Sequence, residues 1–357
     1  MMKIIQRYVT INLLWTTLLA LAVLVALYSF FSLIDQLEDA GRGNYGVLQA
    51  VTFVILTMPR LAYELFPIAA VIGAMATLGI MAQNSELDVI RTSGVSRVQL
   101  TGVMARAGLV LVLLALIIGE LVAPISGEQA QQMRTIALTK QITLKTKYGF
   151  WARDGNSYVN IRKVLPGNQV EQIYIYEFDS ERRLRSSTHA GRATYQDNQW
   201  RLERIEQTII NGQKITSRKL HHAAWDSLLN PEMINLVIVQ PQYLPIWGLS
   251  RYIGYLRQNA QNTRIYEQAL WVKLVRPLSI IAMIILAVPL VRGHSRSTAI
   301  GQRVFIGALI GVVFHIVNEA SGSIGVVYDI PPALSAGTPT LMLMIALVWL
   351  LRANGPE

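Results

Sequence analysis

Six long apolar runs constrain this chain more than any other feature of its sequence. A helix needs about 20 apolar residues to cross a bilayer. The runs are Leu13–Leu33, Ala50–Met81, Gly102–Ile125, Leu270–Val291, Val304–Val317 (or on to Val327) and Ala333–Leu351. They predict an α-helical polytopic membrane protein with six transmembrane helices, arranged three plus three around a polar insert. The first run is too long for the core of a signal peptide, about 7–15 residues, so we expect a retained helix.

Composition supports a membrane protein and excludes several chemistries. Charged residues make up only 15% of the chain, against roughly 25% in soluble domains. The chain has no cysteine, which excludes disulfides, thiolate metal sites and a cysteine nucleophile. Its five histidines include no pair spaced i, i+4 that could chelate a metal from one helix face. We therefore expect no metal site.

Basic residues in the short loops predict the orientation. They gather at the N-terminus, after the second and fourth runs, and at the C-terminus: Lys3, Arg7, Arg91, Arg97, Arg292, Arg296, Arg303 and Arg352. Both termini are therefore predicted to be cytoplasmic and the insert periplasmic. The insert holds 19 Lys and Arg against 12 Asp and Glu. Because most of the net charge of +10 then lies outside the cytoplasm, we expect no nucleic acid partner.

The insert has the pattern of a β domain. β-branched and aromatic residues in short runs, separated by turn residues, are typical of strands. The predicted strands are Phe150–Ile161, interrupted by a turn at 153–156, Val170–Phe178, Arg192–Tyr195, Trp200–Ile210 and Gln213–Leu220, the last two joined by a type I′ turn at Asn211-Gly212. These runs favour a sandwich or a jelly-roll-like fold, and Gln258–Thr263 is expected to be a polar helix leading into the fourth span. The predicted domains are 1–126, with a cytoplasmic coupling helix at about 84–97, then 127–267 and 268–357.

No motif for nucleotide hydrolysis is present. A P-loop needs Gly-Lys followed by Ser or Thr, and none of the eight lysines follows a glycine. The chain also lacks G-x-S-x-G and H-E-x-x-H. Composition and motifs leave three classes open: a transporter subunit that depends on a separate motor, a membrane enzyme, and a membrane-anchored scaffold that does not transport. Isolated activity would favour the enzyme, and absence of substrate from the membrane cavity would favour the scaffold.

The cytoplasmic segment Gln83–Gln99 predicts a short amphipathic helix. Asn84 or Ser85 can cap it and Gly94 can end it. Its first turn carries two acids and its apolar stripe has two members: Glu86, Asp88, Leu87 and Ile90. The helix either lies on the lipid surface or docks into a motor subunit. Two acids fit an anionic lipid surface poorly, which favours docking.

Ionisable residues inside the spans are functional candidates. Arg60 and Glu64 are spaced i, i+4 between two prolines, and they either neutralise each other or leave Arg60 facing a lumen. His315 and Glu319 share a face of the fifth span, where they either line a cavity or cap the helix. Some residues have simpler expected roles: Lys273 and Arg276 to snorkel, and Glu120 to reach the headgroups. Phe66 either faces lipid or core or contacts substrate.

Several local strings resemble the YjgP/YjgQ (LptF/LptG) family of lipopolysaccharide export permeases, and its G-type more than its F-type members. The strings include Asp35-Gln36-Leu37, Phe66-Pro67, Ser85-Glu86-Leu87, Gly119-Glu120, Ala123-Pro124, Gly127-Glu128-Gln129, Trp151-Ala152-x-Asp154-Gly155-Asn156 and Pro331-Pro332. Each string alone is weak, whereas their order and spacing over the whole chain are specific.

This resemblance implies the permease subunit of an ABC exporter in the inner membrane of a Gram-negative bacterium. The exporter would extract lipopolysaccharide from the outer leaflet and pass it through jelly-roll domains toward the outer membrane. The implied partners are an LptF-type paralogue, an LptB-type cytoplasmic ATPase dimer, an LptC-type bitopic subunit and an LptA-type periplasmic bridge. The ATPase would use ATP and Mg²⁺, and this chain would hold no cofactor. Glu86, Leu87, Asp88, Ile90 and Arg91 would couple to it.

One departure from the family concerns the first span. G-type members often carry lysines on and just above this span, thought to meet substrate phosphates, whereas Ser32, Glu38 and Asp39 occupy the matching positions here. We expect other cations near the outer membrane face to take that role. The predicted residues of the substrate cavity and gate are therefore Ser32, Arg42, Arg60, Phe66, Arg134, His315 and Glu319.

Overall fold

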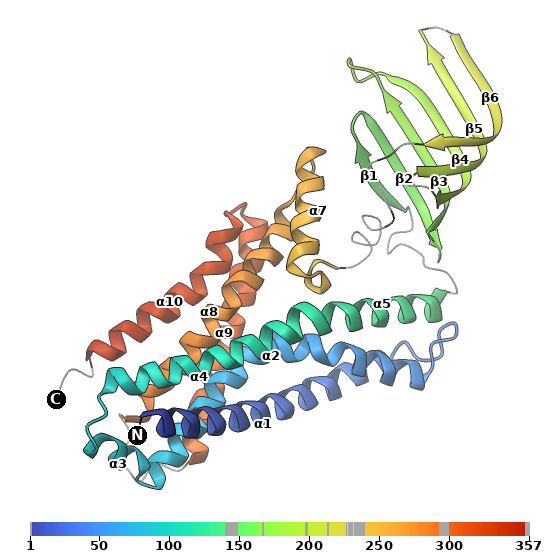
Figure 1. Ribbon diagram of the computed structural model, residues 1–357. Coiled ribbons are helices and arrows are strands. Elements are labelled where there is room, and N and C mark those ends of the chain that lie inside the picture. The colour runs from blue at the N-terminus through green and yellow to red at the C-terminus, as the bar shows by residue number, and fades with distance from the viewer. Residues whose placement is uncertain are drawn as a thin grey trace. The chain divides into compact units, whose positions relative to one another are not determined.

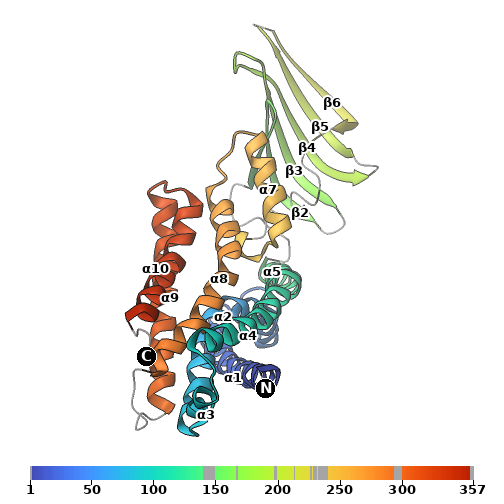
Figure 2. The same ribbon diagram turned by 60° about the vertical axis from the view of Figure 1, so that its left-hand side comes forward.

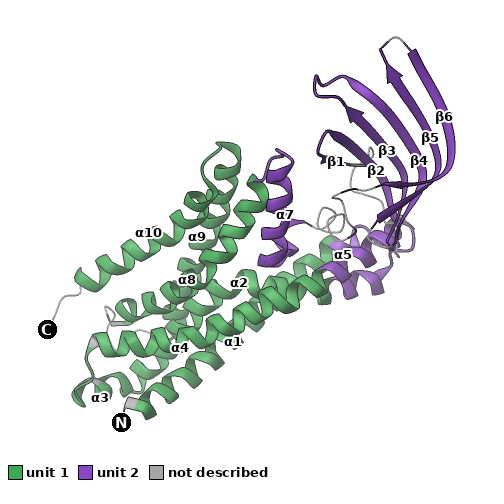
Figure 3. Cartoon of the chain, turned by 45° about the horizontal axis from the view of Figure 1, so that its top comes forward, with its two compact units in different colours: residues 1–35, 54–127, 264–357 green, residues 36–53, 128–263 purple. Residues whose placement is uncertain are grey.

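The computed structural model divides into two compact units (Figure 3). It describes residues 2–139, 149–165, 168–196, 199–212, 214–225, 227, 231, 240–292 and 300–353. Unit 1 comprises Met1–Asp35, Val54–Gly127 and Arg264–Glu357, and unit 2 comprises Gln36–Phe53 and Glu128–Thr263. The apolar helices belong mainly to unit 1, and the β-sheet belongs to unit 2.

Among the described residues, six helical segments are long and apolar enough to cross a membrane, which confirms the prediction of six spans. They are α1 (Met2–Leu37), α2 (Val47–Gln83), α4 (Arg97–Ile117) continued through the π-helical turn η1 (Ile118–Val122) into α5 (Ala123–Thr139), α8 (Arg264–Arg292), α9 (Ile300–Val327) and α10 (Pro332–Ala353) (Figure 1). α9 reaches the longer of its two predicted ends. Most spans extend beyond the predicted apolar runs because the polar flanking turns continue the helices.

Unit 1 is built around α2. In its most apolar stretch 78% of the residues are buried, against 17% in α1 and in α9. Leu65, Phe66 and Met75 of α2 are almost fully buried, among side chains of α1, α4 and α8. The outer flanks of α1 and α9 therefore present broad apolar surfaces, which need lipid or a partner chain to cover them.

The described part of unit 2 contains an antiparallel sheet of six strands, which confirms the predicted β domain in the middle of the chain. Neighbouring strands follow one another in sequence order, as a meander (Figures 1 and 2). The strands are β1 (Phe150–Asp154), β2 (Ser157–Leu165), β3 (Gln169–Phe178), β4 (Leu184–Gln196), β5 (Gln199–Asn211) and β6 (Lys214–Trp225). The predicted turn at 153–156 joins β1 to β2 through Gly155, whose φ is +58°.

Strand β5 ends one residue later than predicted. Asn211 pairs with Lys214 and belongs to the strand, and Gln213, the predicted start of the next strand, lies outside the described residues. Gly212 has a φ of +63°, a conformation that glycine adopts without a steric penalty. The glycine therefore sets the start of the loop, while Asn211 remains in the strand.

A transverse row of residues interrupts the alternation of the sheet. The row residues are Arg162, Gln172, Gly191, Arg204 and His221, one on each strand from β2 to β6, and each is skipped in the ladders that join these five strands. On either side of the row, residues three apart face the same buried side: Ile161 and Val164, Val170 and Ile173, Ala190 and Ala193, and Leu202 and Ile205. Gln172 and Arg204 have positive φ. Each of these strands thus carries one extra residue at the same level of the sheet. The alternation of buried and exposed side chains therefore changes in all of them together, and one continuous apolar face is kept.

The prediction of a polar helix over Gln258–Thr263 is wrong. Helix α7 (Ile246–Gln258) ends there, and α8 begins only at Arg264. The end is a Schellman motif, in which the amide of Gln261 donates to the carbonyl of Leu256 at 2.9 Å and Ala260 has a φ of +51°. Glycine usually occupies this left-handed position, so alanine there hides the helix end from sequence inspection.

Helix α7 packs against the β1–β2 hairpin within unit 2. The Tyr255 hydroxyl donates to the carbonyl of Arg153 at 3.0 Å, and the amide of Gly155 donates to Asn259 Oδ1 at 3.2 Å. Burial raises the pKa of the Tyr255 hydroxyl. Before α7, Tyr243 of the short turn η2 (Pro241–Tyr243) accepts a hydrogen bond from Gln131 of α5 at 3.3 Å.

Candidate functional site

A buried ion pair joins two spans of unit 1. Lys273 Nζ of α8 lies 2.8 Å from Glu120 Oε1 of the π-helical turn, and the side chains are only 6% and 10% exposed. Lys273 Nζ also lies 3.5 Å from the carbonyl of Gly119. The expectation that Lys273 snorkels and Glu120 reaches the headgroups is therefore wrong. A π-helical turn holds an extra residue, which changes the face that its side chains occupy, and a buried charge persists only with a partner.

Tyr63 of α2 packs directly against this pair. A Cβ atom on Gly119 would lie 2.4 Å from the Tyr63 ring, so only glycine permits the observed approach. Two cationic groups also lie near the Tyr63 ring: Arg276 Cζ is 4.4 Å and Lys273 Nζ is 5.7 Å from the ring centroid. Cations near an aromatic ring within about 6 Å are attracted by its quadrupole. The aromatic ring thus links α2 to the ion pair.

Arg60 and Glu64 form the second charged contact of α2. Arg60 Nε donates to Glu64 Oε1 at 2.8 Å, and the side chains are 20% and 28% exposed. Of the two alternatives open from sequence, the structure shows the pair. Pro59 and Pro67 lie within the same helix on either side of it.

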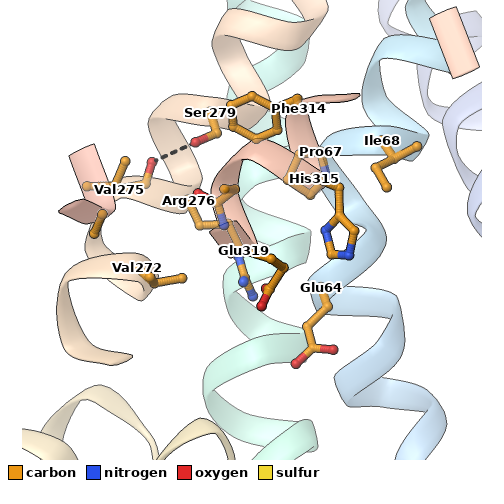
Figure 4. Close-up of a pocket in the computed structure, with 12 residues that line it drawn as sticks. Glu64, Pro67, Ile68, Val272, Val275, Arg276, Ser279, Phe314, His315 and Glu319 are labelled. Carbon is orange, nitrogen blue, oxygen red and sulfur yellow. Dashed lines mark hydrogen bonds between the residues drawn. The ribbon is translucent and has the colours of Figure 1, made fainter. Parts of the chain in front are cut away.

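Glu64 also lines a small polar cavity among α2, α8, α9 and α10 (Figure 4). His315 and Glu319 of α9 and Arg276 of α8 line it too, and its volume is about 30 Å³. In Figure 4 the Glu64, His315 and Glu319 side chains extend into the same region. The volume suits about one water molecule, which needs roughly 10–15 Å³ in such measures. The cavity is thus a polar node between helices, too small in this chain alone for a lipid.

Glycines hold the rest of α9 close to α2. Added Cβ atoms would lie 3.1 Å from Met75 at Gly307 and 2.7 Å from Ile68 at Gly311. One helical repeat earlier, Arg303 is only 3% exposed and donates to the carbonyl of Gly79 at 3.0 Å. Arg303, Gly307, Gly311, His315 and Glu319 follow one another at four-residue spacing. Small residues let membrane helices approach closely, and here polar residues lie at both ends of the glycine contact.

Two of the predicted substrate cations meet at one carboxylate in unit 2. Asp39 binds Arg42 at 2.5 Å and Arg134 at 2.7 Å through its two oxygens. The Arg134 guanidinium also lies 5.5 Å from the centroid of the Phe53 ring. Beside them burial raises the pKa of the Tyr45 hydroxyl, which Arg134 opposes. The three charged groups carry one net positive charge, in the segment that follows the first span.

The remaining predicted cavity residues do not join these groups. Phe66 is fully buried in the core of unit 1, and Ser32 is half-buried on α1. The structure thus brings His315 and Glu319 together at one cavity, and Glu64 connects Arg60 to it. Arg42 and Arg134 bind the same carboxylate. Among the described residues no group of three or more His, Asp or Glu side chains could hold a metal ion.

Lys273, Glu120 and Tyr63 were not selected from sequence as one site. Their positions are far apart in the chain, and the only sequence signal was two opposite charges within spans three and four. Arg303 was assigned to a basic loop, although it is buried inside a helix.

Helix α3 (Glu86–Thr92) occupies the predicted cytoplasmic segment. Leu87 and Ile90 pack against the core of unit 1. Gly94 has a φ of +89°, and the amide of Val95 donates to the carbonyl of Ile90 at 3.3 Å, so the helix ends at the predicted glycine. The apolar stripe therefore faces the chain itself.

The outward side of α3 differs from the predicted one. Val89 is 63% exposed and was not selected from sequence. Glu86 is half-buried and accepts a hydrogen bond from the Tyr8 hydroxyl of α1 at 2.9 Å. Asp88 is also half-buried, and the side chain of Arg91 lies outside the described residues.

Known proteins resemble this chain over almost its whole length. Residues 7–353 match the family described as lipopolysaccharide export system permease LptF/LptG. The chain is 34% identical over 351 residues to the lipopolysaccharide export system permease protein LptG of Escherichia coli (strain K12), covering 98% of each protein. It is 34% identical over 354 residues to the protein of that name from Haemophilus influenzae, covering 98% of this chain and 99% of that protein.

Proposed function

This chain belongs to the LptF/LptG family and is a permease subunit of the lipopolysaccharide export system, and from this premise we propose that it forms half of a channel driven by a separate ATPase. It is a multi-pass inner-membrane protein and a transporter subunit rather than an enzyme. The observation that carries the motor proposal is α3, a helix anchored to unit 1 by its apolar stripe that presents Val89 outward.

The family implies a transport complex with other Lpt proteins, and the finer assignments are part of the proposal. An LptF-type paralogue supplies the other half of the channel, and an LptB-type dimer, using ATP and Mg²⁺, docks on α3. An LptC-type subunit and an LptA-type bridge complete the route. The exposed apolar flanks of α1 and α9 support partner chains, because only 17% of each span's most apolar stretch is buried.

Basic loops support the proposed orientation. Lys3, Arg7, Arg292 and Arg352 lie at the ends of spans on one side, together with α3. Both termini are then cytoplasmic, and the β-sheet of unit 2 lies in the periplasm.

The cations of the outer segment support an anionic lipid as substrate. The Asp39, Arg42 and Arg134 group keeps one excess positive charge, which a lipid phosphate can pair with. Arg60, already held by Glu64, and His315 with Glu319 lie deeper in the spans and are proposed to act at the gate. Ser32 on α1 remains a proposed cavity residue, whereas Phe66 on α2 is fully buried in the core and is no longer proposed to contact substrate.

The coupling proposal is tested in the reconstituted complex. Val89→Arg alters the exposed side of α3 without disturbing its packed stripe. Val47→Arg is the matched control, because Val47 is 61% exposed and lies at the opposite end of α2 from α3. We expect Val89→Arg to reduce both lipopolysaccharide release to an acceptor and ATP hydrolysis in proteoliposomes, or to prevent binding of the ATPase.

Glu86→Ala provides a second test in the same assay. It removes the acceptor of the Tyr8 hydrogen bond and should weaken coupling less than Val89→Arg if Glu86 mainly positions α3. Equal transport by the Val89 and Val47 variants, with the ATPase bound normally, would exclude α3 as the docking element.

A further inference from the structure

The first three strands of unit 2 carry an open cavity of about 870 Å³ on the face opposite the buried side of the sheet. Trp151, Tyr158 and Tyr176 line it, whereas Ala152, Val159 and their neighbours on the other face are buried. Cavities that hold small ligands usually measure about 300–1,000 Å³. Three of its lining residues, Trp151, Arg153 and Asn156, belong to the Trp151-to-Asn156 string, for which transport through the membrane gives no role.

Aromatic rings form the wall of this cavity. Trp151 and Tyr176 are stacked, with ring centroids 5.9 Å apart and planes inclined by 21°. Tyr158 and Phe178 meet edge to face at 5.5 Å. Trp151 is nevertheless 53% exposed and Tyr158 41% exposed. Their exposed ring faces are electron-rich and attract the polarised C–H groups of a flat, partly apolar ligand.

Two arginines give the cavity its charge. Arg153 and Arg182 line it together with Asp179. The Arg153 Nε atom donates to the carbonyl of Gly155 at 3.0 Å, and its guanidinium lies 5.7 Å from the centroid of Tyr158, so the side chain is held in place. No ion pair joins either arginine to Asp179 among the described contacts.

Asp179 serves the turn that follows β3 instead. It accepts hydrogen bonds from the amides of Glu181 and Arg183 at 2.9 and 2.8 Å and from the Arg183 guanidinium at 3.0 Å. The backbone amide of Arg183 lowers the pKa of this carboxyl group. Its charge is therefore compensated locally, and Arg153 and Arg182 leave the cavity selective for an anion.

We propose that this cavity binds an anionic saccharide, a sugar that carries phosphate or carboxylate groups. The stacked Trp151 and Tyr176 contact the sugar ring, the arginines pair with its charge, and Asn156 and Ser180 supply polar contacts to hydroxyl groups. An acyl chain would leave the arginines unpaired. A peptide added to the sheet would use the edge of β1, whereas these side chains lie on the face.

The physiological source follows from the permease assignment, on which this part of the proposal rests. The sugar portion of the exported lipid and a free sugar phosphate share the same chemistry. Two probes distinguish them: lipopolysaccharide from which all acyl chains have been removed with its phosphates retained, and glucose 6-phosphate. Neither probe needs the ATPase, so binding can be measured independently of transport.

The test is calorimetric titration of the full-length chain in detergent. The deacylated lipopolysaccharide should bind more tightly than glucose 6-phosphate and lose affinity as salt rises. Trp151→Ala and the double variant Arg153→Ala/Arg182→Ala should each weaken binding about tenfold or more. The matched control is Trp247→Ala on α7, because Trp247 is 55% exposed and does not line the cavity; it should bind as the unchanged chain does.

Several results would overturn the proposal. They are the absence of binding by the unchanged chain at millimolar probe, equal binding by all variants, and equal affinity for a dephosphorylated probe. Protection of Trp151 from oxidation by a periplasmic Lpt protein, but not by the probe, would assign the patch to a protein interface instead. Trp151→Phe guards against a folding defect, since it keeps a ring and should bind with intermediate affinity. If no saccharide binding is found but Val89→Arg still reduces transport as expected, the saccharide site is excluded and the proposed permease function stands.

Discussion

Two Lys–Glu ion pairs with the same distance between nitrogen and oxygen lie in opposite surroundings within this molecule. Lys273 and Glu120 of unit 1 meet at 2.8 Å, and so do Lys219 and Glu206 of the sheet in unit 2. The side chains of the first pair are 6% and 10% exposed, and those of the second are 82% and 57% exposed. Distance alone therefore says little about what a pair contributes. Water solvates the second pair when it separates, whereas nothing replaces a lost partner in the first.

Removing one member of the buried pair should have the largest effect. Glu120→Leu leaves the amino group of Lys273 buried without its partner and should lower the free energy of unfolding by about 3–5 kcal/mol. The double variant Glu120→Leu/Lys273→Met removes both charges and should recover most of the loss. Thermal unfolding of the detergent-solubilised chain measures both. A double variant as unstable as the single one would show that the ion pair itself stabilises the fold. The loss in the single variant would then not come from an unpaired buried group.

The close approach of α2 to the π-helical turn should matter next most. Gly119→Ala places a methyl group against the Tyr63 ring and should destabilise the chain by about 1–3 kcal/mol. Gly102→Ala is the matched control on α4, where nothing lies within 4 Å of an added Cβ atom. It should be neutral, or stabilise by up to about 1 kcal/mol through helix propensity. Equal unfolding temperatures for the two variants would contradict the contact.

The exposed pair should show the smallest effect, visible in titration rather than in stability. The hydrogen bond from Lys219 lowers the pKa of Glu206, and the same contact raises the pKa of Lys219. The contribution of Glu206 to stability is present above the pKa that the group has in the unfolded chain. It is lost as the pH falls through the pKa of the folded chain. The contribution of Lys219 is present below its unfolded pKa and is lost as pH rises through its folded pKa.

Lys219→Ala should therefore raise the pKa of Glu206 toward its ordinary value without changing the unfolding temperature measurably. Carbon-13 NMR of labelled glutamate carboxyl groups in the full-length chain follows this titration. Lys214→Ala is the control, since Lys214 lies on the same strand and should leave the Glu206 pKa unchanged. If Lys219→Ala destabilised the chain as much as Glu120→Leu, the exposed and the buried pair would not differ in their contribution to stability.

Local patterns account for much of this architecture. The six spans follow from runs of apolar residues and the strands of the insert from strand and turn residues, and Gly94 marks the end of α3. The end of α7 escaped detection because Ala260 adopts the conformation that Gly94 adopts in α3. Both helices end at a residue with positive φ, but only α3 has glycine there, which is the residue that predicts a helix end from sequence.

Most of the site depended on contacts that no local pattern contains. The Lys273–Glu120 pair joins residues 153 positions apart, and Gly119 admits Tyr63 from a different helix. Arg60 and Glu64, only four residues apart, were recognisable as a pair. The extent of β4 was also missed, since Gly191 interrupts the alternation that identifies a strand.

The transverse row in the sheet also limits how its strands can change in length. Deleting Gln172 alone would restore the plain alternation of β3, while β2 and β4 kept their extra residue. The pairs on one side of the row, such as Ile173 with Ala190, would then lose their register with the pairs on the other side, such as Glu171 with Arg192. Insertions and deletions at this level are tolerable only when adjoining strands acquire them together, whereas the turns between strands are free to vary in length.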